Sequence, residues 1–273
     1  GRPVWTTIVV VTVVHYGPEA RFQGKLPKLT HQADAPMSAF AARMQRDTPD
    51  RVVCLGDCIE DRDHDADLAA YRQCMSRLNE AGPERICVAG NHDRINLDGS
   101  ELRAAWGLGP GPLYRSFAVG PLHVVVLATH EERDTRITID RDQLAWLEAD
   151  LAASSGDVVV FMHHSAADQD LRGNRWFEGA PHICLVEGRQ ALRALFEGCG
   201  RVRLVMNGHL HWNHCQVIAG IPYVTLQSLI ENIDDDAPGR PAAAHAWITH
   251  DASGVHVDVR GEQPCRYQFA TAR

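Results

Sequence analysis

The sequence lacks any apolar run of the roughly 18 to 20 residues that a membrane helix needs. Its N-terminal segment has no basic region followed by a leucine-rich core, so we expect no signal peptide. Eight cysteines are present, but no two form a Cys-x-x-Cys pair, which disfavours thiolate zinc sites. Cys54 and Cys87 lie within apolar segments, where a buried and inert thiol is the usual state. These absences favour a reduced, cytoplasmic protein without a membrane partner.

Blocks of like charge are also scarce. The longest is Asp234-Asp235-Asp236, and the net charge of the chain is -8, which disfavours a nucleic-acid partner held through its phosphates. The apolar and charged fractions, 45% and 23%, are ordinary for a globular protein, and 273 residues can bury a large core. We expect one domain over residues 1–273, with its core at about 4–235 and a C-terminal hairpin and tail at about 237–273.

Five apolar segments of strand type each end in His, Asp or Asn. They occupy residues 8–15, 52–57, 86–93, 158–164 and 202–211. In an open α/β sheet, ligands bind at the carboxyl ends of the strands, so we expect these five ends to meet in one crevice. A crevice lined by imidazoles, carboxylates and an amide oxygen suits borderline or hard metal ions, and the spacing indicates two ions.

Amphipathic helices alternate with these segments, which predicts an α/β fold, bordering on α+β, with a largely parallel sheet. The helical patterns cover residues 37–44, 68–78, 144–151 after an N-cap at Asp140, and 192–196 before Gly198. Three hairpin patterns join residues 114–119 to 122–128, 214–219 to 221–227, and 245–250 to 255–260. The adjacent hairpins near the C-terminus predict a second sheet packed on the first. The aperiodic stretches 165–186 and 231–241 are candidate substrate-facing loops.

Each polar strand end, taken alone, has an ordinary structural reading. A single histidine such as His15 is more often a hydrogen-bonded structural residue than a ligand, and Gly56-Asp57 alone can be a turn. Gly90-Asn91-His92-Asp93 is a stronger signal, because it carries three different polar functions in a row. The occurrence of all five ends in this order is what favours a metal site.

The set resembles the calcineurin-like metallophosphoesterase superfamily, whose pattern reads D-x-H, G-D-x-x-(E/D), G-N-H-(E/D), a strand-terminal His, and G-H-x-H. The matching segments are 13–15, 56–60, 90–93, His163 and 208–211, and the resemblance covers roughly residues 4 to 235. Residues 143–148 also resemble members that hydrolyse cyclic nucleotides and glycerophosphodiesters. The resemblance implies a four-layer α/β/β/α sandwich of two mixed sheets, with a dinuclear metal site at the C-terminal ends of the strands.

The resemblance also implies roles for individual residues. The first metal would take His15, Asp57 and His211, together with the Asp of D-x-H, and the second would take Asp57, Asn91, His163 and His209. Two ions roughly 3.5 to 4 Å apart need a shared anion, here Asp57, and they activate a bound hydroxide that attacks phosphorus. His92 would be catalytic beside the metals, and Asp93 would orient its ring. At the fourth strand end, geometry allows His163 or His164, and the family pattern favours His163.

Val13 departs from the family pattern, because it stands where the family has the metal-ligating Asp. Valine has no donor atom, so the first site loses a bond and a negative charge. Removing even an outer-sphere partner costs about 10- to 100-fold in metal affinity or activity, and a direct ligand should cost more. Three interpretations follow: an enzyme with a weak or empty first site, a natural pseudoenzyme, or a chain whose parent has Asp at this position.

The expected function is metal-dependent hydrolysis of phosphate esters, most of all small phosphodiesters, with activity reduced by Val13. Phosphomonoester hydrolysis is the alternative substrate class, and a non-catalytic binding module, like the retromer subunit that shares this fold, is the alternative function. The cofactors would be two divalent ions of Mn, Fe, Zn or Co. The expected partner is a small phosphate ester, without nucleic acid or membrane, and residues 245–273 are a candidate surface for a homo-oligomer.

Overall fold

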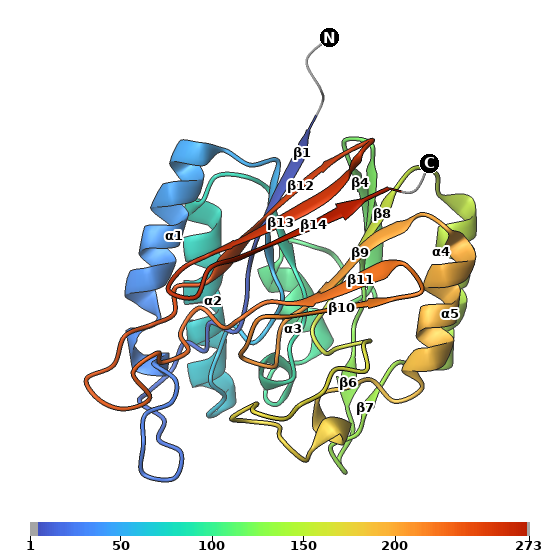
Figure 1. The fold of residues 1–273 in the computed structure, drawn as a ribbon. Helices are drawn as coiled ribbons and strands as arrows, with labels where there is room; N and C mark the ends of the chain where they lie inside the picture. Colours follow the sequence, from blue (N-terminus) through green and yellow to red (C-terminus); the bar gives the residue numbers. More distant parts are fainter. Residues whose placement is uncertain (1–4, 272–273) are drawn as a thin grey trace.

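The computed structural model describes residues 5–271 and has two six-stranded sheets packed face to face, with helices on both outer sides (Figure 1). The first sheet has the order β14-β13-β12-β1-β2-β3. Its strands are β1 (Thr6–Val11), β2 (Arg51–Cys54), β3 (Arg85–Cys87), β12 (His245–Asp251), β13 (Gly254–Arg260) and β14 (Cys265–Ala270). β1, β2 and β3 run parallel, whereas β12 pairs antiparallel with β1. The sheet is therefore mixed.

The second sheet has the order β10-β11-β9-β8-β5-β4 and is also mixed. Its strands are β4 (Arg115–Val119), β5 (Leu122–Val126), β8 (Val158–Met162), β9 (Val202–Asn207), β10 (His214–Ile218) and β11 (Ile221–Thr225). β5, β8, β9 and β11 run parallel, and the hairpin partners β4 and β10 are antiparallel to them. A separate two-stranded ribbon joins β6 (His130–Glu131) to β7 (Ile137–Thr138).

The predicted helices are present. They are α1 (Asp34–Asp47), α2 (His64–Glu80), α4 (Arg141–Ala153) and α5 (Arg189–Cys199), with α3 (Gly99–Ala105) as an unpredicted short helix. Asp140 caps α4 as expected, because its carboxylate accepts the Gln143 backbone N–H at 2.8 Å. The expected end of α5 before Gly198 is wrong: the helix continues to Cys199 and ends at Gly200, whose φ of 71° suits a C-terminal cap. Within residues 5–271, every helix falls short of the length and apolar character that crossing a bilayer requires.

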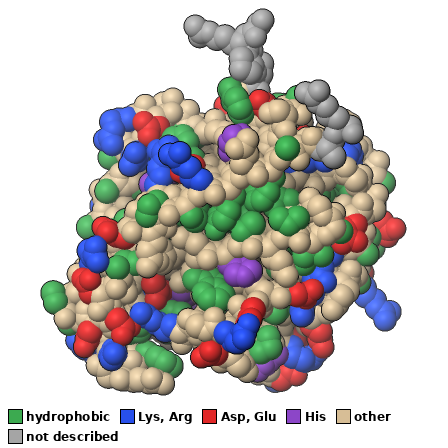
Figure 2. Space-filling model, in the orientation of Figure 1, with side chains coloured by type: hydrophobic (Ala, Val, Ile, Leu, Met, Phe, Trp, Pro, Cys, Tyr) green, Lys and Arg blue, Asp and Glu red, His purple; other side chains and the backbone are tan. Residues whose placement is uncertain are grey.

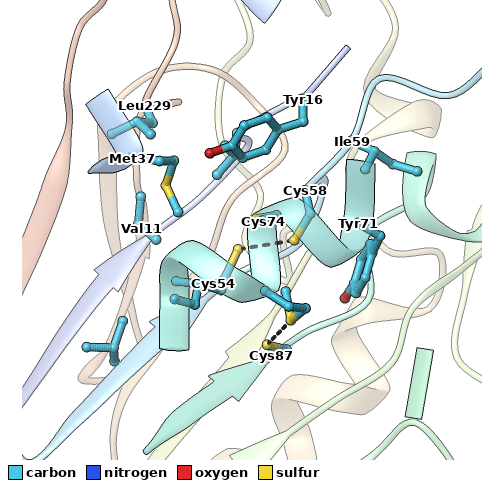
Figure 3. Packing of buried hydrophobic residues seen from close by; sticks show 14 of the residues in the cluster. Val11, Tyr16, Met37, Cys54, Cys58, Ile59, Tyr71, Cys74, Cys87 and Leu229 are labelled. Carbon is cyan, nitrogen blue, oxygen red and sulfur yellow. Dashed lines mark hydrogen bonds between the residues drawn. The ribbon is translucent and has the colours of Figure 1, made fainter. Parts of the chain in front are cut away.

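Three apolar layers hold the sandwich together. The first lies between the first sheet and helices α1 to α3, the second between the sheets, and the third between the second sheet and helices α4 and α5. Figure 3 shows part of the first layer, where Met37 of α1 and Tyr71 of α2 pack beneath β1 and β2. Cys54 and Cys58 meet in this layer with their sulfur atoms 3.6 Å apart, and both thiols are free and buried. The parallel strands are covered on both faces, which explains why they read as continuous apolar runs.

The C-terminal strands differ from the sequence expectation. The hairpin β12–β13 extends the first sheet beside β1, whereas the hairpin β10–β11 belongs to the second sheet. β14 is an additional strand that the sequence analysis treated as tail. β10 and β14 are edge strands, and Figure 2 shows hydrophobic side chains in the middle of the face on which they lie. Tyr267 and Phe269 of β14 are partly buried against the layer between the sheets.

Candidate metal centre

The loops that follow β1, β2, β3, β8 and β9 bring the predicted site residues to one place between the two sheets. Eleven non-glycine residues within residues 5–271 have a positive φ, and five of these lie in the site loops. The five are Val13 (53°), His15 (50°), Asp57 (54°), His209 (70°) and His211 (58°). L-residues rarely adopt this conformation, and such strain concentrates at functional sites. The backbone conformation at these five positions therefore costs free energy, and it turns these side chains inward.

The ring of His163, at the end of β8, is held by the nitrogen that points away from Asp57. Its Nδ1 donates to the Leu55 carbonyl at 2.7 Å. Its Nε2 then lies 3.1 Å from Asn91 Oδ1 and 3.1 Å from Asp57 Oδ2. Burial would lower the pKa of His163, but the facing Asp57 carboxylate raises it above its usual value. The Asp57 carboxylate thus favours positive charge at the place where a cation would bind.

His209 completes this second position from the other side. Its Nε2 donates to the Ile183 carbonyl at 3.0 Å, which leaves Nδ1 buried and without a hydrogen-bond partner among residues 5–271. Burial holds the pKa of His209 well below its usual value, so the ring is neutral at pH 7 and can donate a lone pair. Asp57, Asn91 and His209 thus all lie beside His163, and these are the four residues that the family resemblance assigns to the second metal.

The first position is formed by His15 and Asp57 on one side and His211 on the other. His15 Nε2 lies 4.0 Å from Asp57 Oδ2 and has no hydrogen-bond partner among residues 5–271. Burial lowers the pKa of His15 to about 3, which again gives a neutral imidazole. The rings of His15 and His211 are stacked, with centroids 5.5 Å apart. The same oxygen of Asp57 thus faces both positions, as a bridging ligand must.

These donor sets fit divalent ions of the borderline class. His15 Nε2 and His209 Nδ1 are buried and without hydrogen-bond partners among residues 5–271, and an orphaned buried polar atom is costly unless a ligand satisfies it. The ligand atoms of His15, Asp57 and His92 lie within 4.8 Å of one another, as do those of His163, His164 and His209. An all-nitrogen and oxygen set of this kind suits Mn, Fe, Zn or Co.

Val13 adds no donor to the first position. Its side chain is fully buried, its N–H donates to the Gly56 carbonyl at 3.1 Å, and its carbonyl accepts the Ser228 hydroxyl at 2.7 Å. The φ of 53° is unfavourable for a β-branched residue, whereas Asp and Asn tolerate this region. The backbone at position 13 therefore suits the Asp of the D-x-H pattern better than the valine present.

His92 lies at the mouth of the site, and its orienting partner differs from the expectation. Asp93 was expected to hold the His92 ring, but both of its oxygens are used by buried backbone N–H groups of Asp57, Cys58 and Gly90 at 2.8 to 2.9 Å. Those loops need an internal acceptor, because their N–H groups are removed from water. Asp61 instead accepts His92 Nδ1 at 2.5 Å. Burial would lower the pKa of His92, but Asp57 and Asp61 raise it to about 9.

His164 follows His163 just beyond β8 and makes different contacts. Its Nδ1 is 2.5 Å from the Thr129 hydroxyl, and its Nε2 is buried without a partner among residues 5–271. The His164 and His209 rings lie 4.3 Å apart, and burial holds the pKa of His164 well below its usual value. His163 is therefore the ring that faces Asp57, and His164 packs behind the second position.

Two glycines permit the close approach of the site loops. A Cβ atom at Gly90 would lie 2.2 Å from both the backbone nitrogen and the Oδ1 atom of Asp57. One at Gly56, whose φ is 100°, would lie 2.6 Å from the Gly90 nitrogen and 2.8 Å from His163 Nδ1. Glycine is thus required at both positions by space as well as by conformation.

Sequence reasoning missed several residues around the histidines. Phe177 stacks on His209 with ring centroids 4.7 Å apart, and Trp176 lies 5.0 Å from the ring of His211. Their loop was identified as substrate-facing by its length, but nothing in the sequence indicated these contacts. Glu231 hydrogen-bonds His211 from a loop that is distant in sequence. Only the folded chain brings these groups together.

Sequence comparisons find relatives of this chain among phosphoesterases. The sequence model of the family described as calcineurin-like phosphoesterase matches residues 7–213. A probable cyclic nucleotide phosphodiesterase of Synechococcus sp. is 25% identical over 64% of this chain and 62% of its own length. A cAMP/cGMP dual specificity phosphodiesterase of Mycobacterium tuberculosis is 28% identical over 64% of this chain and 52% of its own. The chain therefore spans between about half and two thirds of the length of these curated relatives.

A solved structure gives the same fold. The crystal structure of a dimetal phosphatase from Danio rerio superposes with a TM-score of 0.75 over 98% of this chain and all of the other, at 17% identity. At that identity the likeness concerns the fold alone. Because the family match covers most of the chain and ends at the Gly-His-x-His segment, the chain belongs to the calcineurin-like phosphoesterase family.

Proposed function

We propose that this chain hydrolyses small phosphodiesters with two bound divalent metal ions, and that cyclic nucleotides are the first substrate class to test. The observation that carries the proposal is Asp57 Oδ2, which faces His163 Nε2 at 3.1 Å on one side and His15 Nε2 at 4.0 Å on the other. The phosphodiesterases from Synechococcus and Mycobacterium tuberculosis support the substrate class. Their identities are low, so the proposal for substrate rests on analogy.

The residues of the chain divide the work. Bound metal ions would supply charge for the phosphoryl oxygens and an activated water as the nucleophile. Asp57, Asn91 and the histidines would hold the ions in fixed places, so that little reorganisation would be needed during the reaction. Asp61 holds Nδ1 of His92 and leaves Nε2 available to hydrogen-bond a phosphoryl oxygen or to give a proton to the leaving alkoxide.

A second candidate function is a metal-binding module without turnover, and Val13 is the observation that favours it. Such a module needs the fold and one ion, but it has no use for a proton donor at the mouth of the site. His92 keeps its carboxylate partner Asp61 and a side chain that is 26% exposed to solvent. This retained geometry favours the enzyme.

The test is an assay of the metal-stripped chain reloaded with Mn(II), Fe(II), Zn(II) or Co(II). The substrates are bis(p-nitrophenyl) phosphate, cAMP, cGMP and, as a monoester, p-nitrophenyl phosphate. We expect metal-dependent release from the diesters exceeding that from the monoester, and its loss in Asp57→Asn. If the reloaded chain binds metal and cleaves none of the four compounds, the binding module is the correct reading.

A further inference from the structure

Behind the first metal position, six side chains form a closed ring of contacts. In order around the ring they are His15, Glu60, Lys28, Trp176, Glu231 and His211. They come from the β1 loop, the β2 loop, the stretch before α1, the 165–186 loop, the segment after β11 and the β9 loop. The ring thus lies next to the first metal position, where Val13 stands in place of the family's anionic ligand.

We propose that Glu60 and Glu231 are positioning residues of the first metal site. Each would hold one of the two ligand histidines by its Nδ1–H and supply, through the imidazole, part of the negative charge that Val13 does not provide. This inference rests on the metal binding in the proposed function, and it gives a role at the first metal to Glu60, the acidic end of the G-D-x-x-(E/D) segment, and to Glu231, which lies outside the family pattern.

The Glu60 arm is short and well defined. Glu60 Oε2 lies 3.0 Å from His15 Nδ1, on the side of the ring opposite to the inward-facing Nε2. The same oxygen accepts Lys28 Nζ at 2.7 Å. Burial would raise the pKa of Glu60, but the hydrogen bond from His15 and the charge of Lys28 hold it below its usual value. Glu60 therefore acts on the far nitrogen of His15 and does not reach the metal position itself.

The Glu231 arm repeats this arrangement at the second histidine. Glu231 Oε2 lies 2.5 Å from His211 Nδ1, and the side chain is only 8% exposed. Its other oxygen accepts Arg175 Nη1 at 3.2 Å and Trp176 Nε1 at 3.3 Å. Three partners for one nearly buried carboxylate fix its position, and Arg175 compensates for the burial of its charge. The ring of His211 is thereby held in its stack with His15.

Aromatic contacts close the ring between the two arms. Lys28 Nζ lies 5.4 Å from the centre of the Trp176 ring, within the range of a cation–π contact. Trp176 in turn lies 5.0 Å from the His211 ring. The His15 and His211 rings stack with an interplanar angle of 21°. A displacement of either glutamate would therefore shift the rings of both histidines.

The second metal position is built differently, which makes the pattern specific. There, His163 and His209 donate to backbone carbonyls, of Leu55 and Ile183 respectively. A neutral carbonyl fixes the ring, but a carboxylate also increases the electron density on the ligating nitrogen. His15 Nδ1 also lies 3.2 Å from the Ile59 carbonyl, so the two positions differ in the carboxylates Glu60 and Glu231 that stand behind the histidines of the first.

The experiment measures metal affinity and not turnover. Metal-stripped wild type, Glu60→Gln and Glu231→Gln are titrated with Mn(II) by calorimetry, so that two binding events are resolved. Gln keeps the size of Glu and removes its charge. We expect the weaker event to lose about 10- to 100-fold in affinity in each variant, the range for outer-sphere partners, and the tighter event to be unchanged. Glu187→Gln is the matched control, because Glu187 pairs with Arg136 at the surface, and we expect wild-type affinities.

The Val13→Asp background sharpens the test. With a direct anionic ligand restored, the loss caused by Glu231→Gln should become smaller than in the wild-type background. The unfolding of each metal-free variant is followed by circular dichroism, which shows whether that variant has kept its fold. If one glutamine variant has lost its fold, the variant of the other glutamate is used for the test.

The inference is overturned if both glutamine variants fold and bind two ions with wild-type affinities, or if they weaken both events equally. The inference and the proposed function can fail independently of each other. A chain that loses its weaker ion in the variants but cleaves no phosphate ester supports the inference and contradicts the enzyme. Glutamine variants that cleave phosphate esters and bind both ions with wild-type affinities contradict the inference and support the enzyme.

Discussion

At the scale of single residues, the site is a set of strained positions with fixed hydrogen-bond partners. Val13, His15, Asp57, His209 and His211 all have a positive φ, and each ligand histidine has its second nitrogen held by a carbonyl or a carboxylate. The sequence motifs identified these residues because chemistry restricts their type. The motifs did not identify Glu231 or Asp61, because an acidic residue in a loop has no distinguishing pattern.

Replacing Val13 by Asp should strengthen the first metal site. The carboxylate adds a direct ligand, and Asp accepts the φ of 53° at lower cost than valine, so we expect a gain of more than about 10-fold in affinity for the weaker ion. Hydrolysis of bis(p-nitrophenyl) phosphate should rise with it. Without metal, the added buried charge near Asp57 should lower the melting temperature.

The matched variant is Val13→Asn, which relieves the same backbone strain without adding charge. Mn(II) titration of the three chains separates the two effects. Equal affinities in Val13→Asp and the wild type would show that position 13 does not face the first metal.

At the scale of elements, the carboxyl ends of the parallel strands position the chemistry. The continuous apolar runs predicted β1, β2, β8 and β9, and the helical periodicity predicted α1, α2, α4 and α5. The short β3 and the short α3 carry weaker patterns. The assignment of β12 and β13 to the second sheet was wrong, because hairpin signals give pairing between neighbours and not the sheet that the hairpin joins.

His245, at the start of β12, should make stability depend on pH. It is 7% exposed and packs on Phe40 with ring centroids 5.7 Å apart, and burial lowers its pKa from 6.5 to about 4. Between these values the unfolded chain binds a proton that the folded chain does not, so stability falls as pH drops from 6.5 to 4 and is fully present above 6.5. The loss from this residue is about 3 kcal/mol.

Urea unfolding of the metal-free chain between pH 4 and 7.5 measures this dependence. We expect His245→Leu to have a shallower slope than the wild type below pH 6.5 and no change in slope above it. Identical slopes in the two proteins would rule out His245 as a source of the acid sensitivity.

At the scale of the whole molecule, the metal centre joins parts that are far apart in the chain. His15 and Asp57 come from loops of the first sheet, whereas His163, His209 and His211 come from loops of the second. Bound ions would therefore link the two sheets at this edge of the sandwich. Loops from three further segments close the first position from outside, through Lys28, Trp176 and Glu231.

Metal binding should therefore stabilise the folded chain. A site with ligand at 100 times its dissociation constant contributes about 2.7 kcal/mol to the free energy of unfolding. We expect Mn(II) to raise the melting temperature of the metal-stripped chain and EDTA to reverse the effect. Asp57→Asn should show little or no rise, since both positions share that carboxylate. An equal rise in that variant would place the stabilising ion elsewhere.

The sequence by itself determined most strands and helices, the order of the polar strand ends and the metal-binding character of their residues. Local periodicity and residue chemistry are sufficient for these features, because each depends on a few neighbouring positions. Only the tertiary structure decided that Asp61, and not Asp93, holds the His92 ring, and that Glu60 and Glu231 stand behind His15 and His211. Those contacts depend on how loops from distant segments pack, and such packing leaves no period or spacing in the chain.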